Sequence, residues 1–330
     1  MKNKIEYFQI IKDAMNLTKE NKFLWWFGLL SMFGGMSGSF SYNFPNNSSK
    51  DKNFDEMAYM NIVRKASFYW EHYQEWIILG IILLAIIFIG LYFLGIIGRG
   101  ALIDSTFKIN KKENVNFSSG FKRGIYFFKR LFLVDMLFFI ALIVSMFILI
   151  FPIVRLFILK SYSIAFSMGL VAFMLLISIF ILFFYLKKYT QMYIISSDLN
   201  IANSIKLSYR LFEKNIKESF IMSLVVVAVN MVISMGLFFA LLVAIIPIGV
   251  LGAIIYGLVG KLLLIIFACL FFLILIGGLI FVSSILNVFF QSIWVLFFVE
   301  IAKQKEIDGS LLAENNPIEL INKKEIESSV

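Results

Sequence analysis

The sequence predicts an all-α protein that crosses a membrane several times. A helix of about 20 residues crosses the roughly 30 Å of bilayer hydrocarbon, and runs such as Trp76–Ile97, Leu131–Val154 and Ser219–Ile246 reach that length. These runs are apolar on every side, whereas a soluble helix alternates faces. The composition agrees, because 60% of residues are hydrophobic, 15% are charged and the mean hydropathy is +0.88. We predict a polytopic transmembrane bundle of about six helices, in three hairpins each preceded by a cytoplasmic amphipathic helix.

In chain order, the first predicted element is a cytoplasmic amphipathic helix over residues 1–22, followed by a six-span transmembrane domain over residues 23–302. Trp25 and Trp26 open the first span, as aromatic residues do at membrane interfaces. The six predicted spans are Phe23–Phe40, Trp76–Ile97, Leu131–Val154, Ser161–Leu186, Ser219–Ile246 and Leu262–Phe281. Residues 303–330 are polar and without sustained periodicity, so we expect a disordered cytoplasmic tail.

The basic residues between the spans predict the orientation. Of the 30 lysines and arginines, 23 lie in the N-terminal segment, residues 98–130, residues 187–218 and the C-terminal tail. The intervening segments hold the other 7. Because cytoplasmic segments of membrane proteins are enriched in Lys and Arg, both termini should face the cytoplasm of a cell membrane.

The segment Ser283–Ile301 allows two interpretations. The chain is apolar from Leu262 onward for too long a stretch to form a single span. Its second half carries polar residues at helical spacing, namely Ser284, Asn287, Gln291 and Ser292. Such a stripe fits a surface helix in the membrane interface or a seventh span inside a bundle. Lys303 and Lys305 directly behind it favour the surface helix.

Three basic segments resemble one another and predict an internal three-fold repeat. They are Ile11–Trp25, Phe121–Val134 and Ile205–Ser219. Each begins with an apolar residue and a lysine, has a small residue two positions after that lysine, and continues into a span. On such helices, basic side chains attract anionic lipid head groups, at about 1 kcal/mol each. The simpler interpretation is that they only orient and anchor the chain.

Several of these segments resemble one family. The resemblance lies in the entry Asn21–Leu30, in Gly98–Leu102 leading to Phe121, and in Ser197–Ala202 continuing through Ser208–Phe212. The chain is similar there to a poorly characterised family of bacterial polytopic membrane proteins, which resembles the membrane domain fused to some glycerophosphodiester phosphodiesterases. The resemblance covers roughly Ile11 to Ile301. It implies a six-span bundle and no activity, because the chain contains no phosphodiesterase catalytic domain.

Three polar residues within the apolar runs are candidates for a functional site. Asp135 lies about one turn inside the third span, where a carboxylate could relay protons or cations. The nearby Lys129 and Arg130 mark a wet interface, which favours a structural role instead. Asn230, midway along the fifth span, could line a polar path or form an interhelical hydrogen bond. Gln291 could line the same path if its helix is buried.

The sequence offers little for catalysis. With one His and one Cys, it cannot assemble a catalytic triad, a Cys–His pair or an HExxH metal motif. We expect no enzyme activity, no catalytic, cofactor or metal site, and no nucleic-acid partner, because the net charge of +9 comes from the segments beside the spans.

Two functions remain as hypotheses. The first is a non-enzymatic membrane scaffold or accessory protein with membrane lipids as partners. The alternative is a transporter or permeation pathway for a small solute or lipid. The alternative requires Asp135, Asn230 and Gln291 to converge on one cavity near the bilayer midplane.

Overall fold

The computed structural model describes residues 5–34 and 56–307, and that part of the chain is helical with no strand. Its helices are α1 Tyr7–Glu20, α2 Leu24–Phe33, α3 Glu56–Asn110, α4 Phe117–Ile158, α5 Tyr162–Ser197, α6 Ile201–Lys214, α7 Ile216–Val259 and α8 Lys261–Ile307. Five of these, α3, α4, α5, α7 and α8, are long and apolar enough to cross a membrane. The predicted all-α polytopic membrane fold is confirmed.

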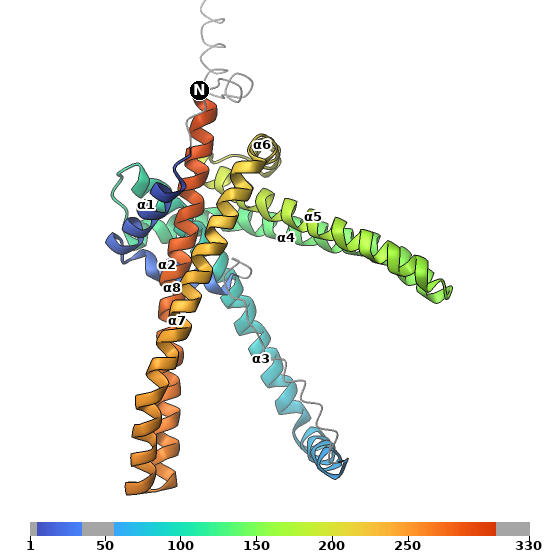
Figure 1. The fold of residues 1–330 in the computed structure, drawn as a ribbon, viewed down its shortest axis with the longest axis vertical. Coiled ribbons are helices and arrows are strands. Elements are labelled where there is room, and N and C mark those ends of the chain that lie inside the picture. Colours follow the sequence, from blue (N-terminus) through green and yellow to red (C-terminus); the bar gives the residue numbers. More distant parts are fainter. Residues whose placement is uncertain (1–4, 35–55, 308–330) are drawn as a thin grey trace, which may run out of the picture.

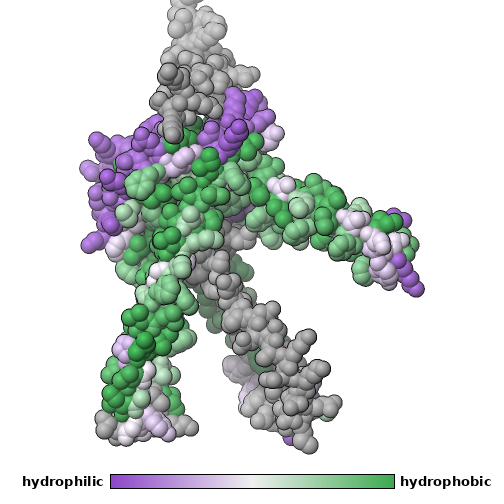
Figure 2. All heavy atoms as spheres, in the orientation of Figure 1, coloured by the Kyte–Doolittle hydropathy of each residue, from purple (hydrophilic) through white to green (hydrophobic). Residues whose placement is uncertain are grey.

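The long helices converge at one end and diverge at the other (Figure 1). We call the region of convergence the hub and the diverging parts the arms: α3 alone, α4 with α5, and α7 with α8. The hub contains most of the buried residues of the long helices, which lie in 96–107 of α3, 120–138 of α4, 185–195 of α5 and 284–298 of α8. Figure 2 shows hydrophilic residues gathered on the outer side of the hub and hydrophobic residues along the α4–α5 and α7–α8 arms.

The arms have the surface that a bilayer requires. In α3, α7 and α8 the most apolar 18-residue stretch contains no buried residue. Helix α4 has 42 residues, so at 1.5 Å per residue it is about 63 Å long, roughly twice the hydrocarbon thickness. One half of α4 therefore lies in the hub and the other half is available to cross the bilayer.

Short turns close the two paired arms. Between α4 and α5 the chain reverses at Leu159–Ser161, where Lys160 has a φ of 57°. Between α7 and α8 it reverses at Gly260, whose φ of 95° suits a residue without a Cβ. These tight turns keep the two helices of each arm adjacent.

Glycines bring the hub helices into close contact. A Cβ on Gly95 of α3 would lie 1.8 Å from the backbone nitrogen of Gly34, and one on Gly28 of α2 would lie 2.4 Å from the Ser284 carbonyl oxygen. Helix α2 is thereby held against both α3 and α8. At ten residues, or about 15 Å, α2 does not cross a bilayer by itself.

The structure corrects both interpretations of Ser283–Ile301. This segment is neither a surface helix nor a separate span, because it continues α8 without a break and is buried from Val288 to Phe298. Two residues of its polar stripe bind α2. The Ser284 hydroxyl donates to the carbonyl of Trp25, and Asn287 Nδ2 donates to the Gly28 carbonyl at 3.0 Å.

A second correction concerns the helix predicted before each hairpin. Helices α1 and α6 are separate, and α6 ends where Asn215 leaves helical geometry, at a φ of −126° and a ψ of 37°. The segment Phe121–Val134 is instead part of α4. That helix begins at the capping box of Asn116 with Ser119, and nothing interrupts it before the apolar run. The three-fold repeat stays a prediction.

Helix α1 covers the hub beside α8 and buries Ile10, Ala14 and Leu17. Burial, and then the carboxylate of Glu218, raise the pKa of Tyr7 on this helix. The Tyr7 hydroxyl is therefore protonated at neutral pH and brings no charge near Glu218.

The predicted spans end where the apolar residues end, but most helices in the structure extend beyond those limits. Residues 98–110, predicted as connecting loop, extend α3, and α7 continues beyond Ile246 to Val259. The first span, Phe23–Phe40, is described only to Gly34. The tail predicted over 303–330 is described only to Ile307, and up to there it belongs to α8.

Candidate functional site

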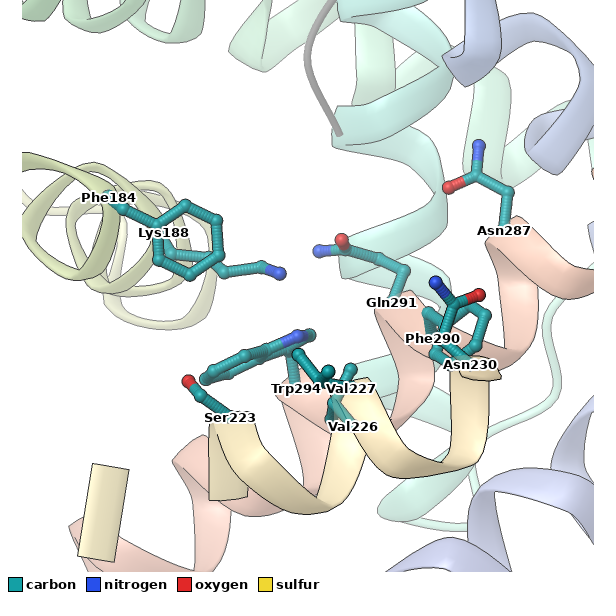
Figure 3. Close-up of a pocket in the computed structure, with 10 residues that line it drawn as sticks. All are labelled: Phe184, Lys188, Ser223, Val226, Val227, Asn230, Asn287, Phe290, Gln291 and Trp294. Atoms are coloured by element: carbon teal, nitrogen blue, oxygen red, sulfur yellow. The ribbon is translucent and has the colours of Figure 1, made fainter. Parts of the chain in front are cut away.

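A pocket lies where α5, α7 and α8 leave the hub (Figure 3). Its volume is about 180 Å³. The lining residues are Phe184, Lys188, Ser223, Val226, Val227, Asn230, Asn287, Phe290, Gln291 and Trp294. The pocket thus combines aromatic and aliphatic walls with one cation and three amide side chains.

Helical periodicity explains why these residues meet. Side chains three or four positions apart share one face of a helix. Phe184 and Lys188 are four apart on α5, and Asn287, Gln291 and Trp294 follow the same spacing on α8. On α7, Ser223, Val227 and Asn230 do the same. One face of each helix is therefore directed into the same space.

Lys188 is the one charged residue in the lining. Its Nζ lies 4.1 Å from the ring centroid of Trp294 and 5.2 Å from that of Phe184, which are cation–π distances. Within the described part of the chain, no carboxylate forms an ion pair with it. The guanidinium of Arg99 is close enough to repel it. A positive charge on Lys188 therefore has no counter-ion among the described residues.

The amides of the pocket divide into two kinds. The Asn287 side chain binds α2, because its Nδ2 donates to the Gly28 carbonyl and to Ser31 Oγ, at 3.0 and 2.6 Å. The side chains of Gln291 and Asn230 make no hydrogen bond within the described residues. Gln291 is only 6% exposed. A buried amide normally has a hydrogen-bond partner, so the Gln291 side chain is available to a molecule in the pocket.

Beside the pocket lies an ionic cluster centred on Asp135. Arg99 Nη1 lies 3.0 Å from Asp135 Oδ2, and Lys187 Nζ lies 3.0 Å from Oδ1. Gln191 Nε2 donates to the same Oδ1 at 2.8 Å. The second guanidinium nitrogen of Arg99 donates to the Gly34 carbonyl at 2.6 Å. This cluster connects α3, α4 and α5 with the end of α2.

The structure therefore separates the three candidate residues of the sequence. Asn230 and Gln291 line one pocket, at the hub end of the arms. Asp135 is buried in the ionic cluster and does not line the pocket. The convergence of all three on one cavity, which the transport hypothesis requires, is not seen.

Sequence reasoning missed Lys188, Trp294 and Arg99. Lys188 is the second of two lysines that follow an apolar run, and both count there only as cations that orient the chain. One signal was present: Lys188 lies four residues after Phe184, so that both share a helix face. The contact with Trp294 on α8 has no counterpart in the local sequence, because more than 100 residues separate the two.

Metal binding has no support in the described residues, which contain no group of three or more His, Cys, Asp or Glu side chains able to hold an ion. The chemistry of the pocket is that of recognition by a cation, amides and aromatic rings.

Comparison of the chain with protein-family models, with curated proteins and with solved structures gave no match. The resemblance to the membrane domain of some glycerophosphodiester phosphodiesterases therefore stays a prediction. The fold and composition define the class: this chain is a multi-pass membrane protein.

Proposed function

We propose that this chain is a non-enzymatic membrane scaffold or accessory protein of the cell membrane. The observation that carries the proposal is the pairing of charges within the hub. Asp135 pairs with Arg99 and Lys187, Asp104 with Lys108 and Arg123, and Asp198 with Arg130. All of these ion pairs except Asp104–Lys108, which lies within α3, join one helix to another, so the charged groups act in assembly rather than in chemistry.

The shape of the molecule supports the same role. Three arms spread from one hub whose outer side is hydrophilic, so the chain covers a wider area of bilayer than a closed bundle would (Figures 1 and 2). The positive charge of the hub segments supports a hub on the cytoplasmic side of the membrane and, with it, cytoplasmic termini. Exposed lysines such as Lys122, Lys129 and Lys206 would then meet anionic lipid head groups.

A second candidate function is passage of a small solute or lipid. The observation that favours it is the shared pocket of Asn230 and Gln291, with Lys188 between the arms. The position of Asp135 argues against passage, because its carboxylate already binds Arg99, Lys187 and Gln191. A relay group needs access to the permeating species, and Asp135 has none through this pocket.

Reconstitution separates the two functions. The purified chain and the double variant Asn230→Leu with Gln291→Leu are placed in liposomes. Release of entrapped small solutes and transbilayer movement of a fluorescent lipid are then measured. The scaffold proposal expects both preparations to match protein-free liposomes. Rates above those of protein-free liposomes that fall in the double variant would contradict it and establish passage through the pocket.

A further inference from the structure

We propose that the pocket between α5, α7 and α8 binds the phosphate-bearing head group of an anionic lipid, whose acyl chains lie along the apolar faces between the two paired arms. The inference goes beyond the scaffold role and holds whether or not that role is correct, because it stands on the geometry of the pocket alone.

The first argument is charge. Lys188 has no carboxylate partner among the described residues, and both burial and the nearby Arg99 disfavour a positive charge on it. Its neighbour Lys187 differs, since it pairs with Asp135 at 3.0 Å. A cation held in a partly apolar site without a counter-ion is costly. An anion supplied by a ligand would remove that cost.

The second argument is the direction of the donors. Figure 3 shows Lys188 Nζ and the amide nitrogen of Gln291 facing each other across the pocket. Two donors that face the same space call for an acceptor between them. Phosphate oxygens bind several donors at once, and contacts with an ionised partner are the stronger hydrogen bonds. Asn230, on α7, lines the same pocket and adds an amide that makes no hydrogen bond within the described residues.

The third argument is size and surroundings. Sites for drug-sized ligands usually occupy about 300–1,000 Å³, so a pocket of about 180 Å³ accepts a small group and not a whole amphiphile. The walls continue into exposed apolar side chains on both arms. Phe184 is 37% and Val227 is 52% exposed, and Leu224 and Met231 extend the same apolar surface of α7. A head group in the pocket therefore leaves its acyl chains beside apolar surface.

The experiment uses the full chain in detergent and short-chain lipids as probes. Binding of dioctanoyl phosphatidylglycerol is titrated by its effect on the thermal unfolding midpoint. Lys188→Gln is expected to weaken binding at least about tenfold, as loss of a charge-assisted contact does. Lys111→Gln removes the same charge from the exposed turn that follows α3 and is expected to leave binding unchanged. Equal weakening by the two variants would place the effect on surface charge and overturn the proposal.

Two further probes test the ligand class. Dioctanoyl phosphatidylcholine, which carries a phosphate but no net charge, is expected to bind at least about tenfold more weakly, because its cationic group faces Lys188. Glycerol phosphate has the anion without the chains and is expected to bind more weakly still. Equal affinity for phosphatidylcholine would contradict anion recognition, and equal affinity for glycerol phosphate would contradict an amphiphilic ligand.

Two other variants keep the proposal testable if Lys188→Gln does not fold. Lys188→Arg retains the cation and is expected to bind phosphatidylglycerol, whereas Val227→Trp fills the pocket from α7 and is expected to abolish binding. Size-exclusion chromatography verifies that each variant is folded. Undiminished binding by folded Val227→Trp would overturn the proposal and leave the scaffold role untouched.

Discussion

At the scale of single residues, two adjacent lysines of α5 have opposite environments. Lys187 belongs to the cluster around Asp135, while Lys188 lies against Trp294 in the pocket. The difference follows from helical geometry, because consecutive residues are rotated by about 100° and meet different neighbours. Lys187 thus joins α5 to α4, and Lys188 remains available to a ligand.

The Asp135 cluster makes a residue-scale prediction about stability. Asp135→Asn leaves Arg99 and Lys187 without their carboxylate, and loss of one partner from a buried ion pair costs about 3–5 kcal/mol. We expect a large fall in the thermal unfolding midpoint in detergent. Asp198→Asn is the control, because its pair with Arg130 is exposed and worth about 1 kcal/mol or less.

Replacing both members of the pair extends this test. The double variant Arg99→Met with Asp135→Leu should lower the free energy of unfolding by less than the sum of the two single changes. The reason is that neither position then holds a buried charge that has lost the other as its partner. Strict additivity of the two changes, or an effect of Asp135→Asn no larger than that of Asp198→Asn, would show that the cluster does not hold the hub together.

At the scale of elements, the sequence predicted the apolar spans but not how far the helices run. Span ends were placed where apolar residues stop, at Ile97 or before Leu131. In the structure α3 and α4 continue through the hub because their polar groups find partners on other helices. Arg99, for example, binds Asp135 and the carbonyl of Gly34, which are 36 and 65 residues away. No local pattern reveals such distant partners.

The candidate site also depends on contacts between residues that are far apart in the sequence. Asn230 and Gln291 were identifiable because polar residues in apolar runs are uncommon. Their common pocket depends on the contact between α7 and α8, which the sequence did not provide. Gln291 had been assigned to a surface helix because the two lysines that follow it suggested an interface. The buried stripe on α8 instead binds α2, through Ser284 and Asn287.

Close contact between α2 and α3 gives an element-scale prediction. Gly95→Ala would place a Cβ 1.8 Å from the backbone nitrogen of Gly34, and backbone atoms cannot move aside as a flexible side chain can. We expect a loss of stability of about 1–3 kcal/mol or more, seen as a lower unfolding midpoint.

Gly90→Ala, on the same helix, is the matched control. A Cβ there meets nothing within 4 Å. Since alanine favours a helix over glycine by about 0.5–1 kcal/mol, the unfolding midpoint should stay the same or rise. If Gly95→Ala behaved like Gly90→Ala, the contact between α2 and α3 would not be close.

At the scale of the whole molecule, the division into hub and arms links fold to function. The hub gathers the ion pairs and the hydrophilic surface, while the two paired arms present apolar side chains to the bilayer (Figure 2), as the exposed apolar residues of α3 also do. The pocket lies at the boundary between these two regions, where α5, α7 and α8 diverge. A lipid head group meets the protein at that same boundary, so the position of the pocket agrees with the ligand proposed for it.

The most direct test of this account is the accessibility of single cysteines in intact cells, in a Cys269→Ser background. Lys160→Cys lies at the tip of the α4–α5 arm, and Ser118→Cys and Asn203→Cys lie on exposed hub positions. With a hub on the cytoplasmic side, a membrane-impermeant reagent should label Lys160→Cys in intact cells and the two hub cysteines only after permeabilisation. Labelling of Ser118→Cys or Asn203→Cys from outside would contradict the account.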